Sequence, residues 1–131
     1  MIVVDASTVV AALIDAGPTG RWASHVLRSD ALAAPHLLPA EVSNILRRAS
    51  LLRDLSTDTA TLARSEFDSL RLELFPFAPC SARIWELREN ITAYDAWYVA
   101  LAESLDTTLA TLDTRLSRAP GPRCAFLVAD Q

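Results

Sequence analysis

The chain has 131 residues, which predicts one domain able to bury roughly two-thirds of its unfolded surface. Apolar residues make up 51% of the chain, but no apolar run approaches the ~18 residues needed to cross a membrane. The formal net charge of −4 argues against a protein that coats nucleic acid, because such proteins usually carry a basic surface.

The residue types that are scarce or missing exclude several chemistries. All twelve basic residues are arginines. The lack of lysine excludes a Schiff base, a Walker-type phosphate lysine and the lysine of a receiver domain. Cys80 and Cys124 lie far apart, and neither has metal-ligand spacing to His25 or His36, so we expect free thiols and no zinc site. No charged and then apolar leader opens the sequence, and we expect a cytoplasmic protein.

The first half of the chain alternates short apolar runs with helical patterns. Met1 to Val4 is an apolar, β-branched run typical of a buried parallel strand, and Asp5 to Thr8 read as the cap of a helix. Gly17 and Pro18 end that helix. The patterns that follow predict, in order, a helix from Thr19 to a turn at Asp30, a strand over 31–34, and a helix from Pro39 to about Leu52.

The second half continues the alternation. Ser56 is expected to cap a helix that turns inward Leu62, Ala63, Phe67 and Leu70. The elements expected next are a strand over 72–77, a helix over 81–89, a helix capped by Thr92, a strand over 107–111, a short helix at Leu116 and an edge strand over 124–128. Of the two roles open to Trp22, Trp85 and Trp97, core packing and base stacking, we expect core packing. Strands alternating with helices predict an α/β fold for a single domain over 1–131, with a mainly parallel sheet of four or five strands between helices.

The stretch from Ile91 to Glu103 is apolar on almost every face, and only Asp95 breaks the apolar run between Ala93 and Ala102. A carboxylate in such a helix loses hydration, which is costly without compensation. A cap, an arginine or a metal ion could provide that compensation. In the first case Thr92 would be the N-cap and Asp95 the third helical residue, as in a capping box.

Four acids are expected at one end of the sheet. Asp5 and Asp113 follow strands, while Glu41 and Asp95 lie in first turns of helices that can start on the same side. Each could simply match a helix dipole, a contribution of roughly 0.3–1 kcal/mol. Dipole matching does not explain why all four fall at one end. Clustered carboxylates repel one another, and a divalent ion removes that conflict; oxygen ligands favour Mg²⁺ or Mn²⁺.

Several stretches together resemble the PIN-domain family and, more narrowly, the VapC-type ribonuclease toxins of prokaryotic toxin–antitoxin pairs. The stretches that carry the resemblance are Asp5-Ala6-Ser7, Leu38 to Arg48, Tyr94 to Glu103 and Leu109 to Leu116. The likeness covers nearly the whole chain in order, spacing and length. The segment over 52–79 carries no family signature.

The resemblance implies a cytoplasmic endoribonuclease that uses Mg²⁺ or Mn²⁺. It assigns the catalytic, metal-binding quartet to Asp5, Glu41, Asp95 and Asp113. It places hydroxyl groups near the metal at Ser7 and Thr111, and it makes Asn44 the residue that steadies Glu41. No Ser–His or Cys–His pair lies near these motifs, so a metal-activated water is the expected nucleophile.

The resemblance also implies an RNA substrate, a homodimer and a small DNA-binding antitoxin of VapB type, with no membrane association. Contacts to RNA or antitoxin are assigned to Arg47, Arg48, Arg115 and Arg118. Each arginine could equally belong to a solvated face. Apolar positions on the helices over 40–52 and 56–72 could form partner surfaces or core.

Two other functions remain open at this point. The first is a catalytically silent PIN-like domain that only binds a partner or RNA; the complete acidic quartet argues against it. The second is a metal-dependent phosphatase or a nuclease acting on DNA flaps, and the lack of long insertions argues against that.

Overall fold

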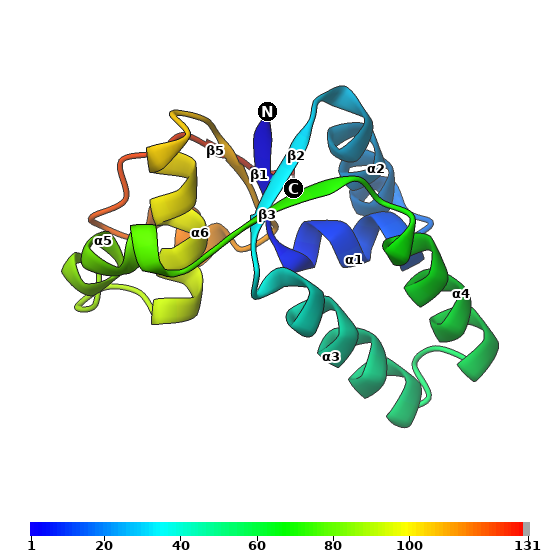
Figure 1. Cartoon of the computed structure of the whole chain (residues 1–131). Coiled ribbons are helices and arrows are strands. Elements are labelled where there is room, and N and C mark those ends of the chain that lie inside the picture. The colour runs from blue at the N-terminus through cyan, green and yellow to red at the C-terminus, as the bar shows by residue number, and fades with distance from the viewer. Residues whose placement is uncertain (130–131) are drawn as a thin grey trace.

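The computed structural model describes residues 1–129, which form a five-stranded sheet with helices on both sides (Figure 1). The strands are β1 (Ile2–Val4), β2 (Leu32–Pro35), β3 (Leu72–Phe75), β4 (Leu109–Ala110) and β5 (Phe126–Leu127). Their order is β3-β2-β1-β4-β5, and every neighbouring pair is parallel. The predicted α/β fold with a parallel central sheet is confirmed.

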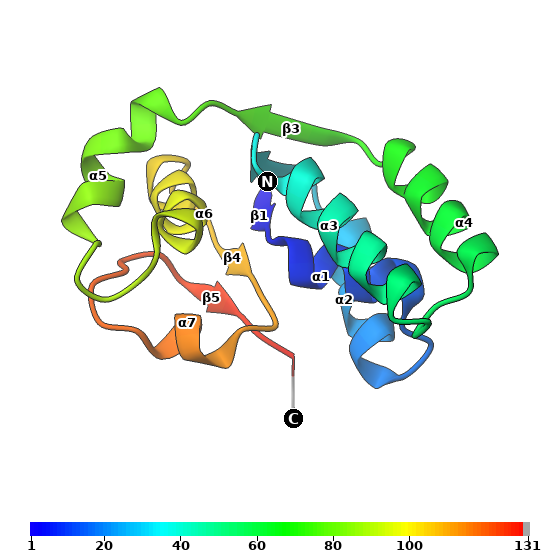
Figure 2. The same ribbon diagram turned by 90° about the horizontal axis from the view of Figure 1, so that it is seen from below.

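The helices form two groups around the sheet. They are α1 (Ala6–Ile14), α2 (Pro18–Ser29), α3 (Leu38–Leu51), α4 (Thr57–Asp68), α5 (Ser81–Glu86), which follows a 3₁₀ turn at Ala78–Cys80, α6 (Ala93–Ser104) and α7 (Thr114–Arg118). In two perpendicular views, α1 to α4 lie at one side of the molecule and α5 to α7 at the other (Figures 1 and 2). None of the helices formed by residues 1–129 has the length and apolar character to span a bilayer.

The strand order creates a switch point beside β1. The chain runs from β1 outward through β2 to β3, and then returns to place β4 on the opposite side of β1. In open parallel sheets, the crevice beyond the carboxyl ends of the strands at such a point is where ligands bind. Asp5 directly follows β1, and Asp113 lies three residues beyond Ala110 at the end of β4. Both acids therefore lie at the switch point.

Helix α6 runs through the core, as its apolar composition predicts. It buries Ala96 and all five residues from Tyr98 to Ala102, and it contacts β1, β2 and β4. A helix that is apolar on every face is stable only when it is covered on every face. Its alanines permit close approach to the sheet, and all residues of β1 and β2 are buried beneath the helices.

An ion pair fixes α5 and the chain after α7 against α6. Arg83 Nε lies 2.7 Å from Glu103 Oε1, and Arg83 Nη2 donates to Glu103 Oε2 at 3.2 Å and to the carbonyl of Gly121 at 2.8 Å. The backbone N–H of Arg123 donates to the same carboxylate at 2.7 Å. Paired donors on one carboxylate give a defined geometry as well as energy. The ion pair between Arg83 and Glu103 therefore sets the position of α5 relative to α6.

Two sequence expectations for individual residues are wrong. Leu62 is 60% exposed because Ala63, one position later, is the residue of α4 that faces the core. Trp85 is 68% exposed, since the short helix α5 turns its neighbour Ile84 inward.

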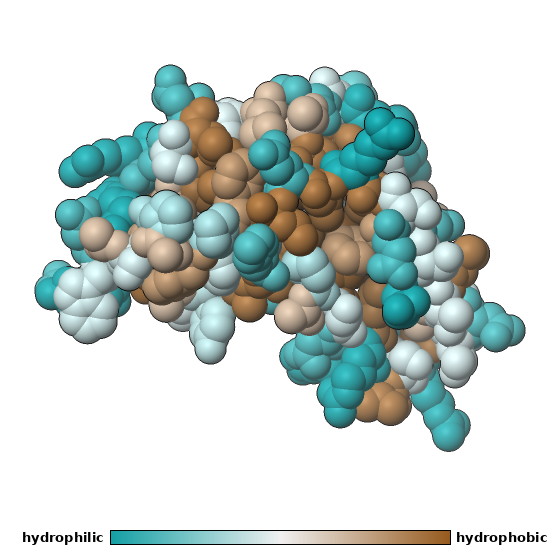
Figure 3. Space-filling view, viewed as in Figure 1, coloured by the Kyte–Doolittle hydropathy of each residue, from teal (hydrophilic) through white to brown (hydrophobic). Residues whose placement is uncertain are grey.

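The element boundaries differ by a few residues from the predicted ones. The strand expected over 72–77 ends at Phe75, before Pro76, and the helix expected over 81–89 ends at Glu86. The strand expected over 107–111 pairs only at Leu109–Ala110. Apolar side chains gather near the centre of the face in Figure 3, the region that β3 crosses in Figure 1. Leu74 of this edge strand is 36% exposed.

A matched pair of leucine substitutions tests the assignment of the core. Leu38→Ala removes a side chain with no exposed surface and should lower the free energy of unfolding by roughly 2–5 kcal/mol. Leu62→Ala removes the same atoms from an exposed position and should change it by less than about 0.5 kcal/mol. Urea denaturation followed by circular dichroism measures both. Equal losses in the two variants would contradict the orientation of α4.

Candidate functional site

Asp5 is held rigidly at the end of β1. Its Oδ1 accepts hydrogen bonds from the Ser7 hydroxyl at 2.7 Å and the backbone N–H of Thr8 at 3.0 Å, and its Oδ2 accepts one from the Thr111 hydroxyl. The Thr8 bond makes Asp5 the N-cap of α1, which confirms the helix cap predicted at this point of the sequence. Asp5 is 9% exposed and Thr111 is fully buried. A buried carboxylate with three donors has a fixed position.

The same network joins the ends of β1 and β4. Thr111 Oγ1 accepts a hydrogen bond from the backbone N–H of Asp113 at 2.9 Å, and Ser7 Oγ accepts one from that of Leu112 at 3.3 Å. Asp113 Oδ1 in turn accepts from the N–H groups of Arg115 and Leu116, at 3.0 and 3.1 Å, and caps α7. The two hydroxyl residues expected near the acids thus position Asp5 and the backbone leading to Asp113.

Asp95 lies in the first turn of α6, where Thr92 is the N-cap and accepts a hydrogen bond from the backbone N–H of Asp95 at 3.2 Å. The predicted cap is therefore present. It does not compensate fully for the burial of Asp95. Burial raises the pKa of Asp95, the negative charges of Asp113 and Asp5 raise it further, and the hydrogen bond with Thr92 lowers it. Asp95 therefore lies close enough to Asp113 and Asp5 for their charges to disfavour its ionisation.

Glu41 lies in the first turn of α3 and accepts a hydrogen bond of 2.6 Å from the Tyr98 hydroxyl. Burial raises the pKa of Glu41, the Tyr98 bond opposes that rise, and the charges on Asp95 and Asp5 add to it. Burial and the neighbouring carboxylates raise the pKa of Tyr98 far above its ordinary value, so Tyr98 stays a protonated donor. Tyr98 was not singled out by the sequence, because a tyrosine in an apolar helix reads as core.

Asn44, which the resemblance placed beside Glu41, is exposed, and it makes no side-chain hydrogen bond to another residue within 1–129. The distance of one helical turn from Glu41 is right for a contact, but Asn44 faces solvent. The steadying role expected of Asn44 falls to Tyr98 in this structure.

The four acids from four segments therefore converge electrostatically. The charge of Asp5 raises the pKa of both Asp95 and Glu41. The charge of Asp113 also raises the pKa of Asp95, and the charge of Asp95 raises that of Glu41. Among residues 1–129, no arginine forms an ion pair with any of these four acids. In this part of the chain, no three Asp, Glu, His or Cys side chains are arranged to hold one metal ion, so an ion at these acids would require side-chain movement.

A hollow of about 570 Å³ opens beside the acids, between the α5–α6 connection and α7. Asp95 and Asp113 line it together with Arg88 and Arg115. Arg115 therefore lies beside two of the four acids, Asp95 and Asp113. Arg88 was not expected there, because a single arginine in a turn has no distinctive sequence pattern.

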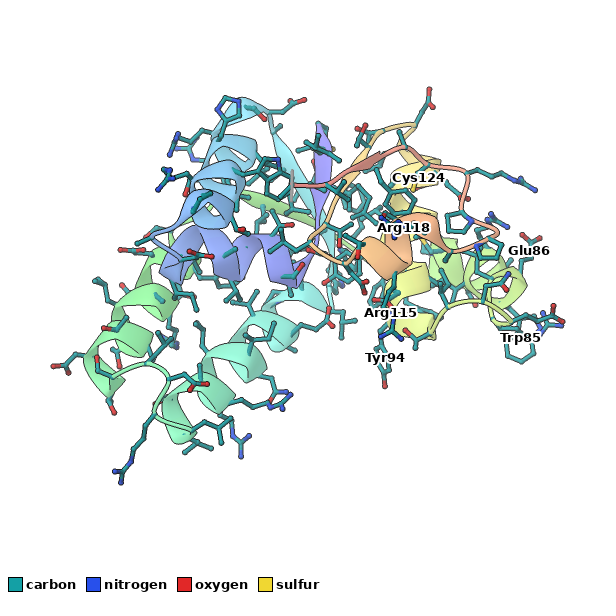
Figure 4. The ribbon with its side chains drawn as sticks, turned by 180° about the vertical axis from the view of Figure 1, so that it is seen from behind. Trp85, Glu86, Tyr94, Arg115, Arg118 and Cys124 are labelled. Carbon is teal, nitrogen blue, oxygen red and sulfur yellow. The ribbon has the colours of Figure 1, made fainter. Side chains whose placement is uncertain are left out.

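The other three arginines assigned to RNA or antitoxin do not line this hollow. Arg47 lies along a separate groove of about 250 Å³ between α3 and α4, and Arg48 is exposed on α3. Arg118 is exposed at the end of α7, and Figure 4 shows it on the same helix as Arg115. Of these four arginines, Arg115 alone lines the hollow beside Asp95 and Asp113.

The cysteines do not offer an alternative nucleophile. Both are free, and burial raises the pKa of the Cys80 thiol. Burial, with the charge of Glu103, raises the pKa of Cys124 to about 11. Both thiols are therefore protonated at neutral pH and poorly reactive.

Comparison with known proteins agrees with this fold. A family model described as PIN domain matches residues 2–122. Ribonuclease VapC1 of Mycobacterium tuberculosis is 43% identical over 93% of this chain and 92% of its own length. Ribonuclease VapC3 of Pyrobaculum aerophilum is 30% identical over 88% of this chain and 92% of its own. The chain belongs to the PIN-domain family, in the group of VapC ribonucleases.

Solved structures share the fold at lower sequence identity. VapBC2 from Rickettsia felis, bound to a DNA fragment from its promoter, matches with a TM-score of 0.71 and 19% identity, covering 99% of this chain and 100% of that one. VapC20 of Mycobacterium tuberculosis, described as a toxin that cleaves the sarcin–ricin loop, matches with a TM-score of 0.68 and 17% identity over 89% of this chain and 93% of its own.

The crowded carboxylates predict a dependence of stability on pH in metal-free protein. The pKa of Asp95 is raised in the folded state, so its ionisation costs stability as pH rises through that raised value. Asp95→Asn should therefore raise the melting temperature at pH 7 in the presence of chelator. This gain should shrink as pH falls through the raised pKa and vanish below the ordinary value of 3.8. Calorimetry across this range measures it, and a lower melting temperature for Asp95→Asn at pH 7 would contradict it.

Proposed function

We propose that this protein is a Mg²⁺- or Mn²⁺-dependent endoribonuclease, the toxin of a VapBC-type pair, with RNA as substrate in the cytoplasm. The observation that carries the proposal is the convergence of Asp5, Glu41, Asp95 and Asp113 with no arginine ion pair among the described residues. The similarity to VapC ribonucleases supports it.

The donor set suits a hard divalent cation. All four side chains offer carboxylate oxygens, the ligands that Mg²⁺ and Mn²⁺ prefer. Asp5, Asp95 and Asp113 would hold the ion, directly or through water, and Glu41 would bind a second ion or orient the attacking water. Such an ion, when bound, lowers the pKa of water and offsets negative charge on the phosphate.

The chain's own residues prepare this site. Ser7, Thr111 and the N–H of Thr8 fix both oxygens of Asp5, so this ligand needs no reorganisation. Tyr98 holds one oxygen of Glu41 and leaves the other available to a water or an ion. Arg115 lies on the rim, where a cation can attract the phosphate backbone into an otherwise acidic hollow.

Substitution of Asp95 tests the site, with Asp58 as its matched control. Asp58 lies in the first turn of α4, so Asp58→Asn makes the same change in the first turn of a helix at an exposed position. Asp95→Asn should lower RNA cleavage in Mn²⁺ by roughly 100-fold or more, since even outer-shell partners of a metal are worth about 10- to 100-fold. Asp58→Asn should cut as fast as the parent, and chelator should stop both. The site assignment is wrong if Asp95→Asn cuts as well as the parent.

The chemistry of the RNA ends tests the nucleophile. Attack by water leaves a 5′-phosphate and a 3′-hydroxyl, whereas attack by the ribose 2′-hydroxyl leaves a 2′,3′-cyclic phosphate. Mass spectrometry of the fragments should find 5′-phosphate ends only. Cyclic phosphate ends would exclude the water route.

A VapB-type antitoxin and a second copy of the chain are the proposed protein partners. One candidate surface is the groove between α3 and α4. The exposed leucines Leu51, Leu52 and Leu62 belong to these two helices or to the end of α3. The edge strand β3 with Leu74 provides another. A solved VapBC complex that shares this fold supports the antitoxin.

A further inference from the structure

The end of α5 carries an exposed stack of two side chains. The guanidinium carbon of Arg88 lies 4.6 Å from the centre of the Trp85 ring, and Arg88 Nη1 donates to the Trp85 carbonyl at 2.9 Å. Trp85 is 68% exposed, whereas Trp22 and Trp97 pack against the core. The arginine therefore fixes a large aromatic ring in solvent, where packing does not require it.

This stack adjoins the acidic hollow. Arg88 lines the hollow together with Asp95 and Arg115. Neither arginine forms an ion pair within residues 1–129. Figure 4 shows Trp85 at the outer end of α5, with Arg115 and Tyr94 on the same face of the molecule. Arg88 therefore links the exposed ring to the acids, because it stacks on Trp85 and also lines the hollow with Asp95, Asp113 and Arg115.

We propose that Trp85 is a stacking platform for an unpaired base of single-stranded RNA, and that Arg88 and Arg115 bind the phosphates between this base and the acidic site. The inference rests on the proposed ribonuclease function and adds a substrate-binding subsite to it. Single strands are bound through bases stacked on aromatic rings and phosphates neutralised by arginine. A guanidinium on one face of an indole also limits its rotation, which lowers the entropic cost of stacking on the other.

The stack favours RNA over a protein partner. Docking of a protein would use the apolar area of Trp85, which a leucine supplies in part, whereas stacking requires a flat aromatic ring. The two arginines without ion pairs suit a polyanion. Trp85→Leu and Trp85→Phe therefore separate the two kinds of partner.

Binding is measured with a 12-nucleotide, fluorescein-labelled single-stranded RNA of mixed sequence. The protein is the Asp95→Asn variant in Mg²⁺, which separates binding from cleavage, and fluorescence anisotropy gives the affinity. Trp85→Leu should weaken binding at least about fivefold, the lower end for one stacked base, and Trp85→Phe should keep most of the affinity. Both variants should bind an abasic RNA of the same length like their parent.

The arginines are tested in the same assay. Arg88→Ala should weaken binding and reduce the slope of log affinity against log salt by about 0.7, the value for one phosphate contact to a single strand. Arg71→Ala is the matched control, because Arg71 is exposed at the amino end of β3, the opposite end of the sheet. Arg71→Ala should leave both affinity and slope unchanged.

Two results overturn the platform. One is equal RNA affinity for Trp85→Leu and the parent; the other is a change in sedimentation mass with Trp85→Leu but none in RNA affinity, which would assign Trp85 to a protein interface. Cleavage by the chain with Asp95 intact is scored separately. If the chain cleaves RNA but Trp85→Leu binds RNA as tightly as its parent, the platform is wrong and the ribonuclease function stands. If Trp85→Leu weakens RNA binding but the chain with Asp95 intact does not cleave RNA, the ribonuclease function is wrong and the platform stands.

Discussion

Repulsion among carboxylates at the ends of β1 and β4 is the constraint on which the rest of the structure depends. Asp5 cannot move away from its neighbours, because Ser7, Thr8 and Thr111 hold both of its oxygens. Asp95 and Glu41 approach it from two helices whose first turns begin at the same end of the sheet. The fold thus accepts a local cost in stability at this point, as functional sites commonly do.

The remainder of the molecule supports that concentration of charge. Apolar helix α6 anchors Asp95 to the centre of the sheet, and the same helix presents Tyr98 to Glu41. The Arg83–Glu103 pair fixes α5 and the chain after α7 behind the hollow. The segment that carries Arg88 and Trp85 is therefore held in place through Arg83, while both side chains are exposed to solvent. This arrangement suits the proposed binding of a flexible single strand.

The sequence predicted the features that depend on neighbouring residues and missed those that depend on distant ones. Strands, caps and the acids follow from local patterns, so Ser56 and Thr92 were correctly assigned as caps. The bond between Tyr98 and Glu41 joins residues 57 apart, and no local pattern encodes it. The exposure of Trp85 was missed because α5 has only six residues, too few for its apolar period to fix which side faces inward.

The central claim is that Asp5, Asp95 and Asp113 share one divalent ion beyond the carboxyl ends of the parallel strands. Anomalous diffraction from a crystal soaked in Mn²⁺ tests it most directly, because the signal locates the ion without reference to activity. The account predicts one strong peak within bonding distance of these three carboxylates. A peak elsewhere, or acids turned apart and paired with arginines at saturating Mn²⁺, would contradict it.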